Sequence, residues 1–266
     1  PELKVGYYIQ DYEPYFYTPG TDGYQTAFDS YTLIPSLVRV VTTQWIYDQV
    51  QQHHRPAAER DLPCTVIGAS LDTALFWPRP RRGPEWPDRP LRIAAMIRPS
   101  SERRSPHLTM EVLQKISQKY GAQVEFKLFG TRPSEPGFAS LPQNFPWQLA
   151  GELSQRQVAS LLNDADIFVD FSTFQGLGLT AMEAMSCGCA VIVPGQGGTG
   201  TFAHHEENCL VVDTSSSQAC YKALQRLLED HLLRTRLQSS AISAAMQFHP
   251  ELPAYRLLKA LFPEAA

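Results

Sequence analysis

From Leu91 to Glu229, short β-prone runs alternate with segments that have the periodicity of amphipathic helices. The predicted strands are Leu91–Met96, Val124–Phe129, Trp147–Leu149, Ile167–Asp170, Ala190–Val193 and Leu210–Val212. The predicted helices between them are Leu108–Tyr120, Ser154–Leu162, Leu179–Cys187 and Ser216–Glu229. Such alternation with short loops is the pattern of a parallel sheet covered by helices on both faces. We therefore predict a Rossmann-like, doubly wound α/β domain, whose ligands bind beyond the carboxyl ends of its strands.

A stretch rich in proline and arginine precedes this domain. Five prolines fall within 78–90, and each lacks an amide donor and biases its predecessor away from helix. We predict a linker at 78–90, a partial N-terminal domain at 1–77, the α/β domain at 91–245, and a C-terminal helix within 246–266 that packs back toward the N-terminal part. The elements expected before the linker are the strands Val5–Ile9, Leu37–Val41 and Thr65–Ile67 and the helix Gln44–Gln52. Three strands with so little helix form a poor core, so we expect 1–77 to be part of a larger domain.

Composition and charge argue against several classes of function. The formal net charge is −4, so no global field attracts nucleic acid. Five cysteines without a regular framework indicate reduced thiols and a cytoplasmic location. Eight arginines do cluster between Arg79 and Arg104, which is typical either of a phosphate-binding group or of a solvated linker.

The most informative stretch runs from Phe171 to Met185, between a predicted strand and a predicted helix. Gly176 and Gly178 allow the backbone to approach a ligand closely, and the free amides of the first helical turn point toward an anion. Glu183 lies about one turn into the helix. Its carboxylate either accepts hydroxyl protons, such as those of a ribose, or only complements the helix dipole. The sequence thus predicts a phosphate site at this turn.

The same glycines also fit a dinucleotide fingerprint, Gly176-x-Gly178-x-x-Ala181. That fingerprint expects an acidic residue at the end of the next strand, about 20 residues further on. Ala190–Val193 instead runs into Pro194–Gly198 without an acid. A nicotinamide-dependent oxidoreductase is therefore the second alternative.

This stretch resembles the acidic signature of glycosyltransferase family 4, a GT-B family, in which two glutamates with seven residues between them flank a glycine-rich turn. Glu183 matches the second glutamate. Gln175 occupies the first position, and it keeps a hydrogen-bonding side chain but lacks the charge. Arg98 and Arg103 are similar to the basic pair with which the family grips the donor diphosphate, and Gly130 is similar to the glycine before the nucleotide.

The resemblance implies that 91–245 is the donor-binding domain of a GT-B glycosyltransferase that uses a nucleoside-diphosphate sugar and retains the anomeric configuration. It implies that Arg98 and Arg103 bind the diphosphate and that Glu183 binds the ribose, which makes these three the catalytic group. The other donor-binding residues that it implies are Gln175, Gly176, Leu177, Gly178, Leu179, Thr180 and Gly130. We expect neither a metal nor a further cofactor, since the arginines neutralise the diphosphate.

The opening segment, Tyr7–Tyr17, resembles part of bacterial rhamnosyltransferases of polysaccharide synthesis, where it belongs to the acceptor domain. This resemblance implies transfer of rhamnose to a growing bacterial polysaccharide or glycan, with a glycan or lipid-linked acceptor as partner. Most of the acceptor domain is expected to lie outside this chain, and peripheral membrane association through that region is left open. A nucleotide-sugar-binding module that is inactive without the acceptor domain is a further alternative.

Overall fold

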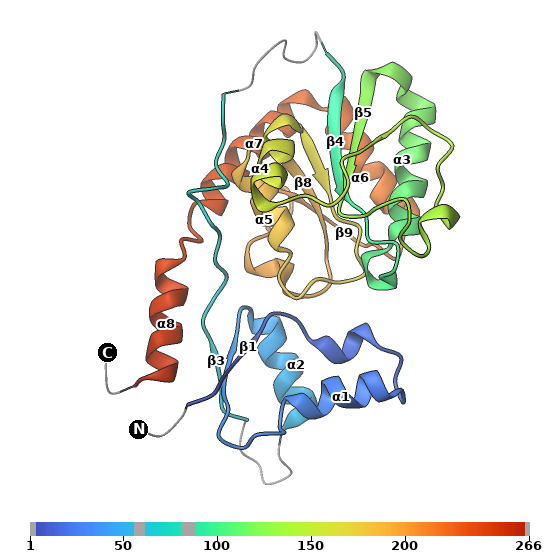
Figure 1. Cartoon of the computed structure of the whole chain (residues 1–266). Helices are drawn as coiled ribbons and strands as arrows, with labels where there is room; N and C mark the ends of the chain where they lie inside the picture. Colours follow the sequence, from blue (N-terminus) through green and yellow to red (C-terminus); the bar gives the residue numbers. More distant parts are fainter. Residues whose placement is uncertain (1–3, 56–61, 81–88, 264–266) are drawn as a thin grey trace. The chain divides into compact units, whose positions relative to one another are not determined.

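The computed structural model describes residues 4–55, 62–80 and 89–263 (Figure 1). The chain forms two compact units. The three-stranded unit comprises Pro1–Ser70, Gln175–Leu177 and Phe248–Ala266, and the six-stranded unit comprises Leu71–Phe174 and Gly178–Gln247. Residues 81–88 of the predicted linker lie outside the described residues, and the predicted domain boundaries stay predictions.

The three-stranded unit has a parallel sheet in the order β1-β2-β3. Its strands are β1 (Gly6–Ile9), β2 (Val38–Val41) and β3 (Cys64–Val66). Its helices are η1 (Glu13–Phe16, a 3-10 turn), α1 (Asp22–Ser30), α2 (Gln44–His54) and α8 (Glu251–Leu261). An apolar cluster that includes Ile9, Tyr31, Val41 and Ile46 fills the unit, and α8 contacts β2.

Helix α1 was not predicted, so the expectation of little helix between these strands was wrong. Thr21 caps the helix, because its side chain accepts a hydrogen bond from the Tyr24 amide over 3.3 Å. No residue of α1 is buried. Tyr24, Ala27 and Phe28 lie at helical spacing and are half-buried, and the centre of the Phe28 ring lies 4.3 Å from the centre of the His54 ring. This short apolar side was missed by the sequence analysis, which depends on longer stripes.

The six-stranded unit confirms the predicted fold class. Its strands are all parallel, in the order β6-β5-β4-β7-β8-β9. They span β4 (Leu91–Met96), β5 (Val124–Phe129), β6 (Gln148–Leu149), β7 (Ile167–Val169), β8 (Ala190–Pro194) and β9 (Leu210–Val212). The strand order reverses at β4, which pairs with β5 on one side and β7 on the other. This is the strand order of a dinucleotide-type doubly wound sheet.

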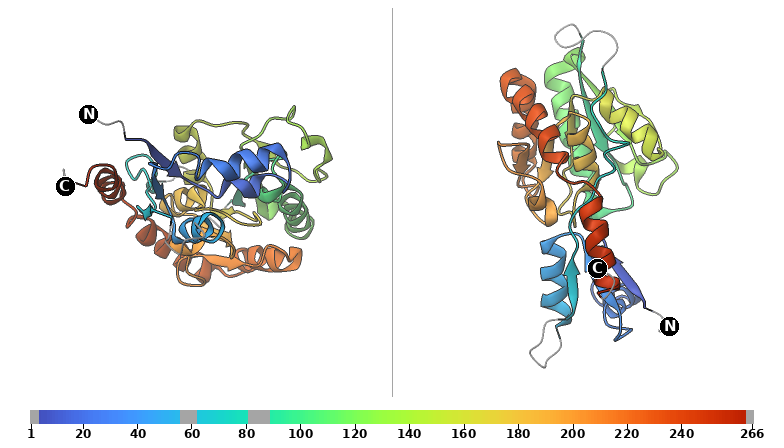
Figure 2. Two further views of the ribbon diagram at one scale, coloured as in Figure 1. Left: turned by 90° about the horizontal axis from the view of Figure 1, so that it is seen from below. Right: turned by 90° about the vertical axis from the view of Figure 1, so that its left-hand side faces the viewer.

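Helices flank both faces of this sheet (Figure 2). They are α3 (Pro106–Tyr120), α4 (Gln155–Asp164), α5 (Leu179–Ser186), α6 (Ser217–Glu229) and α7 (His231–Ala245). Helix α3 contacts α6, whereas α5 contacts α4 and α7. Two predicted helix ends are confirmed: the Ser154 amide donates to the Gln157 side chain at 2.9 Å, and Gly188 after α5 has a φ of +85°.

Candidate donor site

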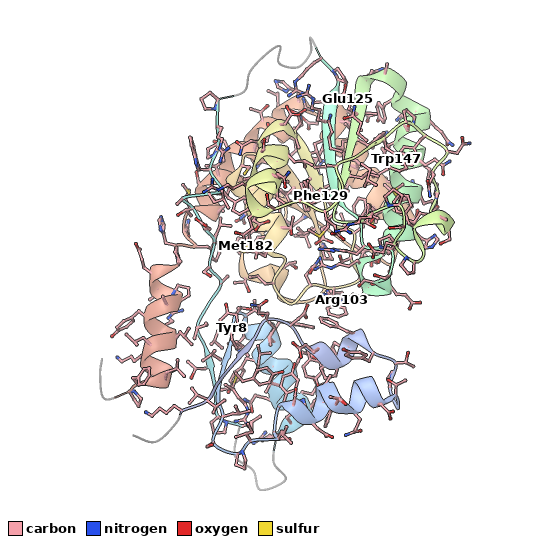
Figure 3. All side chains as sticks on the ribbon, in the orientation of Figure 1. Tyr8, Arg103, Glu125, Phe129, Trp147 and Met182 are labelled. Atoms are coloured by element: carbon pink, nitrogen blue, oxygen red, sulfur yellow. The ribbon has the colours of Figure 1, made fainter. Side chains whose placement is uncertain are left out.

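The loops that follow β4 and β7 meet at the point where the strand order reverses. In open parallel sheets this edge is where ligands bind. Arg98 follows β4 by two residues and is exposed. The chain then turns through η2 (Glu102–Arg104), where Arg103 is half-buried. Figure 3 labels Arg103 at the edge of the six-stranded unit where the parallel strands end.

Arg103 is tied to the turn that precedes α5. The Thr173 amide donates to the carbonyl oxygen of Arg103 at 2.8 Å. The hydroxyls of Ser105 and Thr173 lie 3.3 Å apart. The guanidinium carbon of Arg103 lies 5.4 Å from the centre of the Phe174 ring. The structure therefore brings one of the predicted arginines to the start of the glycine-rich turn.

Arg98 lies against Gly130, the predicted glycine after β5. Gly130 has a φ of +91°, and its amide donates to the Gly151 carbonyl at 2.8 Å. A Cβ at Gly130 would lie 2.9 Å from Met96 Cγ and 3.6 Å from Arg98 Nε. Only glycine fits here for two reasons. The left-handed φ is unfavourable for a residue with a side chain, and a side chain would clash with the loop that bears Arg98.

The amino end of α5 provides open amide donors. Gly178 precedes the helix with a φ of +92°, and its carbonyl accepts the amides of Ala181 and Met182. Among the described residues, the amides of Leu179 and Thr180 have no hydrogen-bond acceptor. Two N–H groups at a helix start, with the positive end of the helix dipole, suit an anion.

The turn is packed on its other side by the loop after β8. A Cβ at Gly178 would lie 3.3 Å from Thr199 Cγ2 and 3.4 Å from the Phe202 ring. Thr199 is held in turn, since its hydroxyl donates to the Pro194 carbonyl at 2.9 Å. The loop after β9 joins as well, because the Thr214 hydroxyl donates to the Ser172 carbonyl at 2.9 Å. The loops after β4, β8 and β9 thus fix the conformation of the turn.

Gln175, Gly176 and Leu177 belong to the three-stranded unit. The Gly176 carbonyl accepts a hydrogen bond from the Thr43 hydroxyl at 2.9 Å across 133 positions of sequence. A Cβ at Gly176 would lie 2.6 Å from the Asp11 carboxylate, so glycine is required by this close approach. Sequence reasoning did not select Thr43 or Asp11 as neighbours of the turn, because no spacing connects positions so far apart.

Glu183 is a buried carboxyl group on α5. It is 7% exposed, and burial raises its pKa to about 7. Among the described residues its carboxylate accepts no hydrogen bond. Such a group is costly to keep charged unless a partner donates to it. A buried carboxyl with a raised pKa is typical of a functional site, and a ligand with hydroxyl donors would satisfy it.

The donor set of this edge consists of guanidinium groups and amides, which bind anions. Among residues 4–55, 62–80 and 89–263, no group of three or more His, Cys, Asp or Glu side chains is placed to hold a metal ion. The metal-independent mechanism stays a prediction. No helix within the described ranges is both long and apolar enough to cross a membrane.

Two curated proteins resemble parts or all of this chain. It is 26% identical over 265 residues to the O-antigen biosynthesis protein RfbC of Myxococcus xanthus. The alignment covers 98% of this chain and 19% of that protein. It is 28% identical over 137 residues to the N,N'-diacetylbacillosaminyl-diphospho-undecaprenol alpha-1,3-N-acetylgalactosaminyltransferase of Campylobacter jejuni. This second alignment covers 52% of this chain and 36% of that enzyme. The chain therefore spans only a minor part of the length of these relatives.

Solved structures show the same fold. Anabaena Alr3699/HepE, solved with UDP and glucose, matches with a TM-score of 0.77 at 17% identity, over 98% of this chain and 72% of that one. Sucrose-phosphate synthase of Thermosynechococcus elongatus matches with a TM-score of 0.76 at 19% identity, over 98% and 68%. The predicted GT-B fold is confirmed. The family model described as "Glycosyl transferases group 1" matches residues 91–230, and the chain belongs to that family.

Proposed function

We propose that this chain supplies the donor-binding part of a retaining glycosyltransferase that uses a nucleoside-diphosphate sugar. One observation carries the proposal. At the point where the sheet order reverses, the loop that bears Arg103 is hydrogen-bonded to the turn leading into α5, beside the open amides of Leu179 and Thr180. The proposal is that these guanidinium and amide donors bind one anion, and such donors suit a diphosphate better than a neutral sugar.

The proposed chemistry is charge stabilisation at the leaving group. As the bond from the sugar to the nucleoside diphosphate breaks, negative charge accumulates on the diphosphate and the sugar becomes oxocarbenium-like. Fixed donors at that position stabilise the transition state more than the ground state. We assign this role to Arg98 and Arg103 together with the amides at the start of α5. Gly130 keeps the space beside Arg98 free of a side chain.

Glu183 is assigned to the ribose hydroxyls of the donor, because it is a buried carboxyl group without a hydrogen-bond donor among the described residues. Gln175 is assigned to the transferred sugar. Its amide both donates and accepts, whereas a carboxylate only accepts. Rhamnose is the proposed sugar, on the resemblance of the segment Tyr7–Tyr17 to rhamnosyltransferases.

A growing bacterial polysaccharide or a lipid-linked glycan is the proposed acceptor. The name of the Myxococcus relative refers to O-antigen biosynthesis, and the name of the Campylobacter relative refers to a diphospho-undecaprenol carrier. We propose a cytoplasmic location, on the five free cysteines. Membership of the glycosyltransferase family favours this function over a nicotinamide-dependent oxidoreductase.

A thermal-shift panel tests the donor site without an acceptor. We expect at least one of ADP, GDP, UDP and dTDP, or its sugar conjugate, to raise the melting temperature, and NAD(H) to have no effect. Arg103→Ala should weaken binding of that nucleotide about 10- to 100-fold, since a charge-assisted hydrogen bond contributes roughly 1.5–3 kcal/mol. Arg132→Ala, which removes an exposed arginine paired with Glu152, is the matched control. Undiminished binding by Arg103→Ala would refute the assignment of the diphosphate site.

Two further measurements separate the alternatives. If Glu183→Gln binds the nucleotide as tightly as the wild type, Glu183 serves only the helix dipole. Transfer assays on this chain and on a longer chain that includes the whole acceptor domain distinguish a self-sufficient enzyme from a module that binds the donor but does not turn it over.

A further inference from the structure

We propose that Phe174 is a positioning residue that orients the Arg103 guanidinium toward the donor diphosphate. This inference rests on the proposed function and concerns the same site. The guanidinium carbon of Arg103 lies 5.4 Å from the centre of the Phe174 ring, within the range of a cation–π interaction. Both side chains are half-buried, so water screens their interaction only in part.

The backbone next to this pair is fixed. The hydrogen bond from the Thr173 amide to the Arg103 carbonyl, 2.8 Å long, joins the residue before Phe174 to Arg103 itself. The hydroxyls of Ser105 and Thr173, 3.3 Å apart, join the same two loops a second time. These contacts hold the main chain of both loops in register at the reversal of the sheet order.

Ser105 supports this view of a constrained loop. It has a φ of +46°, in the left-handed region that a residue with a side chain seldom adopts. Pro106 follows and begins α3. A strained residue persists only where its surroundings determine its conformation, and here those surroundings are the tether to Thr173 and the start of α3.

A fixed backbone does not by itself set the orientation of a long arginine side chain, which has several rotatable bonds. The ring of Phe174 contacts the guanidinium itself and so restricts its orientation, because planar guanidinium groups pack on aromatic faces. A prearranged guanidinium loses less conformational freedom when it binds a diphosphate. Removal of the ring should therefore weaken the binding of diphosphates through Arg103 and leave the binding of the nucleoside unchanged.

The test is a double-mutant cycle. The ligands are the nucleoside diphosphate with the largest shift in the thermal panel, its nucleoside, and inorganic pyrophosphate, each titrated by calorimetry. The variants are Phe174→Leu, Phe174→Met, Phe174→Tyr and Arg103→Ala, together with Phe174→Leu in the Arg103→Ala background. We expect Phe174→Leu and Phe174→Met to weaken diphosphate and pyrophosphate binding about 3- to 10-fold. Phe174→Tyr should restore it, and nucleoside affinity should stay within about 2-fold of the wild type.

The decisive comparison is the effect of Phe174→Leu when Arg103 is absent. If Phe174 acts through Arg103, that substitution has no further effect on diphosphate binding in the Arg103→Ala background. An equal loss in both backgrounds, or a Phe174→Tyr variant as weak as Phe174→Leu, would overturn the proposal. Failure of the proposed function has a different signature: Arg103→Ala itself then binds diphosphates normally, or no nucleotide binds the wild type.

Discussion

Replacement of Glu183 by glutamine should make the stability of the six-stranded unit less dependent on pH. Burial raises the pKa of Glu183 from 4.5 to about 7, so the folded chain holds this proton over a pH range in which the unfolded chain has lost it. Between those two values the folded state binds more protons than the unfolded state. The free energy of unfolding therefore falls as pH rises through this window and levels off above about pH 7.

The expected magnitude follows from the same two values. A difference of one in pKa is worth about 1.4 kcal/mol. Raising the pH from 5 to 8 should thus cost the wild type about 2.5 kcal/mol of unfolding free energy through Glu183 alone. Glutamine has nearly the same shape and no charge to desolvate. Relative to the wild type, Glu183→Gln should therefore gain about 2.5 kcal/mol between pH 5 and pH 8.

Urea titration is followed by hydrogen exchange of peptides from α5 and β8, which reports the free energy of unfolding of the six-stranded unit. This readout is needed because the chain has two compact units that need not unfold together. Glu111→Gln, on the exposed surface of α3, is the matched control and should show a change below about 0.5 kcal/mol. If Glu183→Gln shifts stability by the same amount at both pH values, the carboxyl is not desolvated as the structure indicates.

Three other predictions concern binding and packing. The affinity of the wild type for the nucleotide should rise about 10-fold from pH 6 to pH 8, because Glu183 deprotonates and can then accept hydrogen bonds from the ribose hydroxyls. In calorimetry, the affinity of Glu183→Gln should change less, since only the phosphate itself titrates, near pH 6. Gly178→Ala should lower the unfolding free energy by about 1–2 kcal/mol because of the φ of +92°, while Gly200→Ala, with open space around its Cβ, should stay within about 0.5 kcal/mol. Arg89→Ala should lower the unfolding free energy, measured by urea titration, by about 3–5 kcal/mol, because the buried carboxylate of Asp166 loses two hydrogen bonds of 2.7 and 2.9 Å. A loss no larger than that of the exposed Arg132→Ala would contradict the burial of the Arg89–Asp166 pair.

The elements that local pattern could predict were those inside the large sheet. The predictions for β4 and β5 agree with the structure at both ends. Each strand has four buried residues of six, a proline precedes β4 and a glycine follows β5. Helix α1 escaped prediction because no residue of it is buried. Its apolar side consists of Tyr24, Ala27 and Phe28, which are only half-buried, and so short a stripe is a weak signal.

The fold class followed from the alternation of strand and helix patterns between Leu91 and Glu229. The family and the glycine-rich turn into α5 followed from the residues of short segments of the chain. Which residues surround that turn could be learned only from the folded chain. Ser105 and Thr173 are 68 positions apart, and they meet because β4 and β7 are neighbours in the sheet. The burial that raises the pKa of Glu183 and the stacking of Phe174 on Arg103 have the same origin. The physical reason is that contacts between distant segments follow from the order of the strands, which the local sequence pattern does not specify.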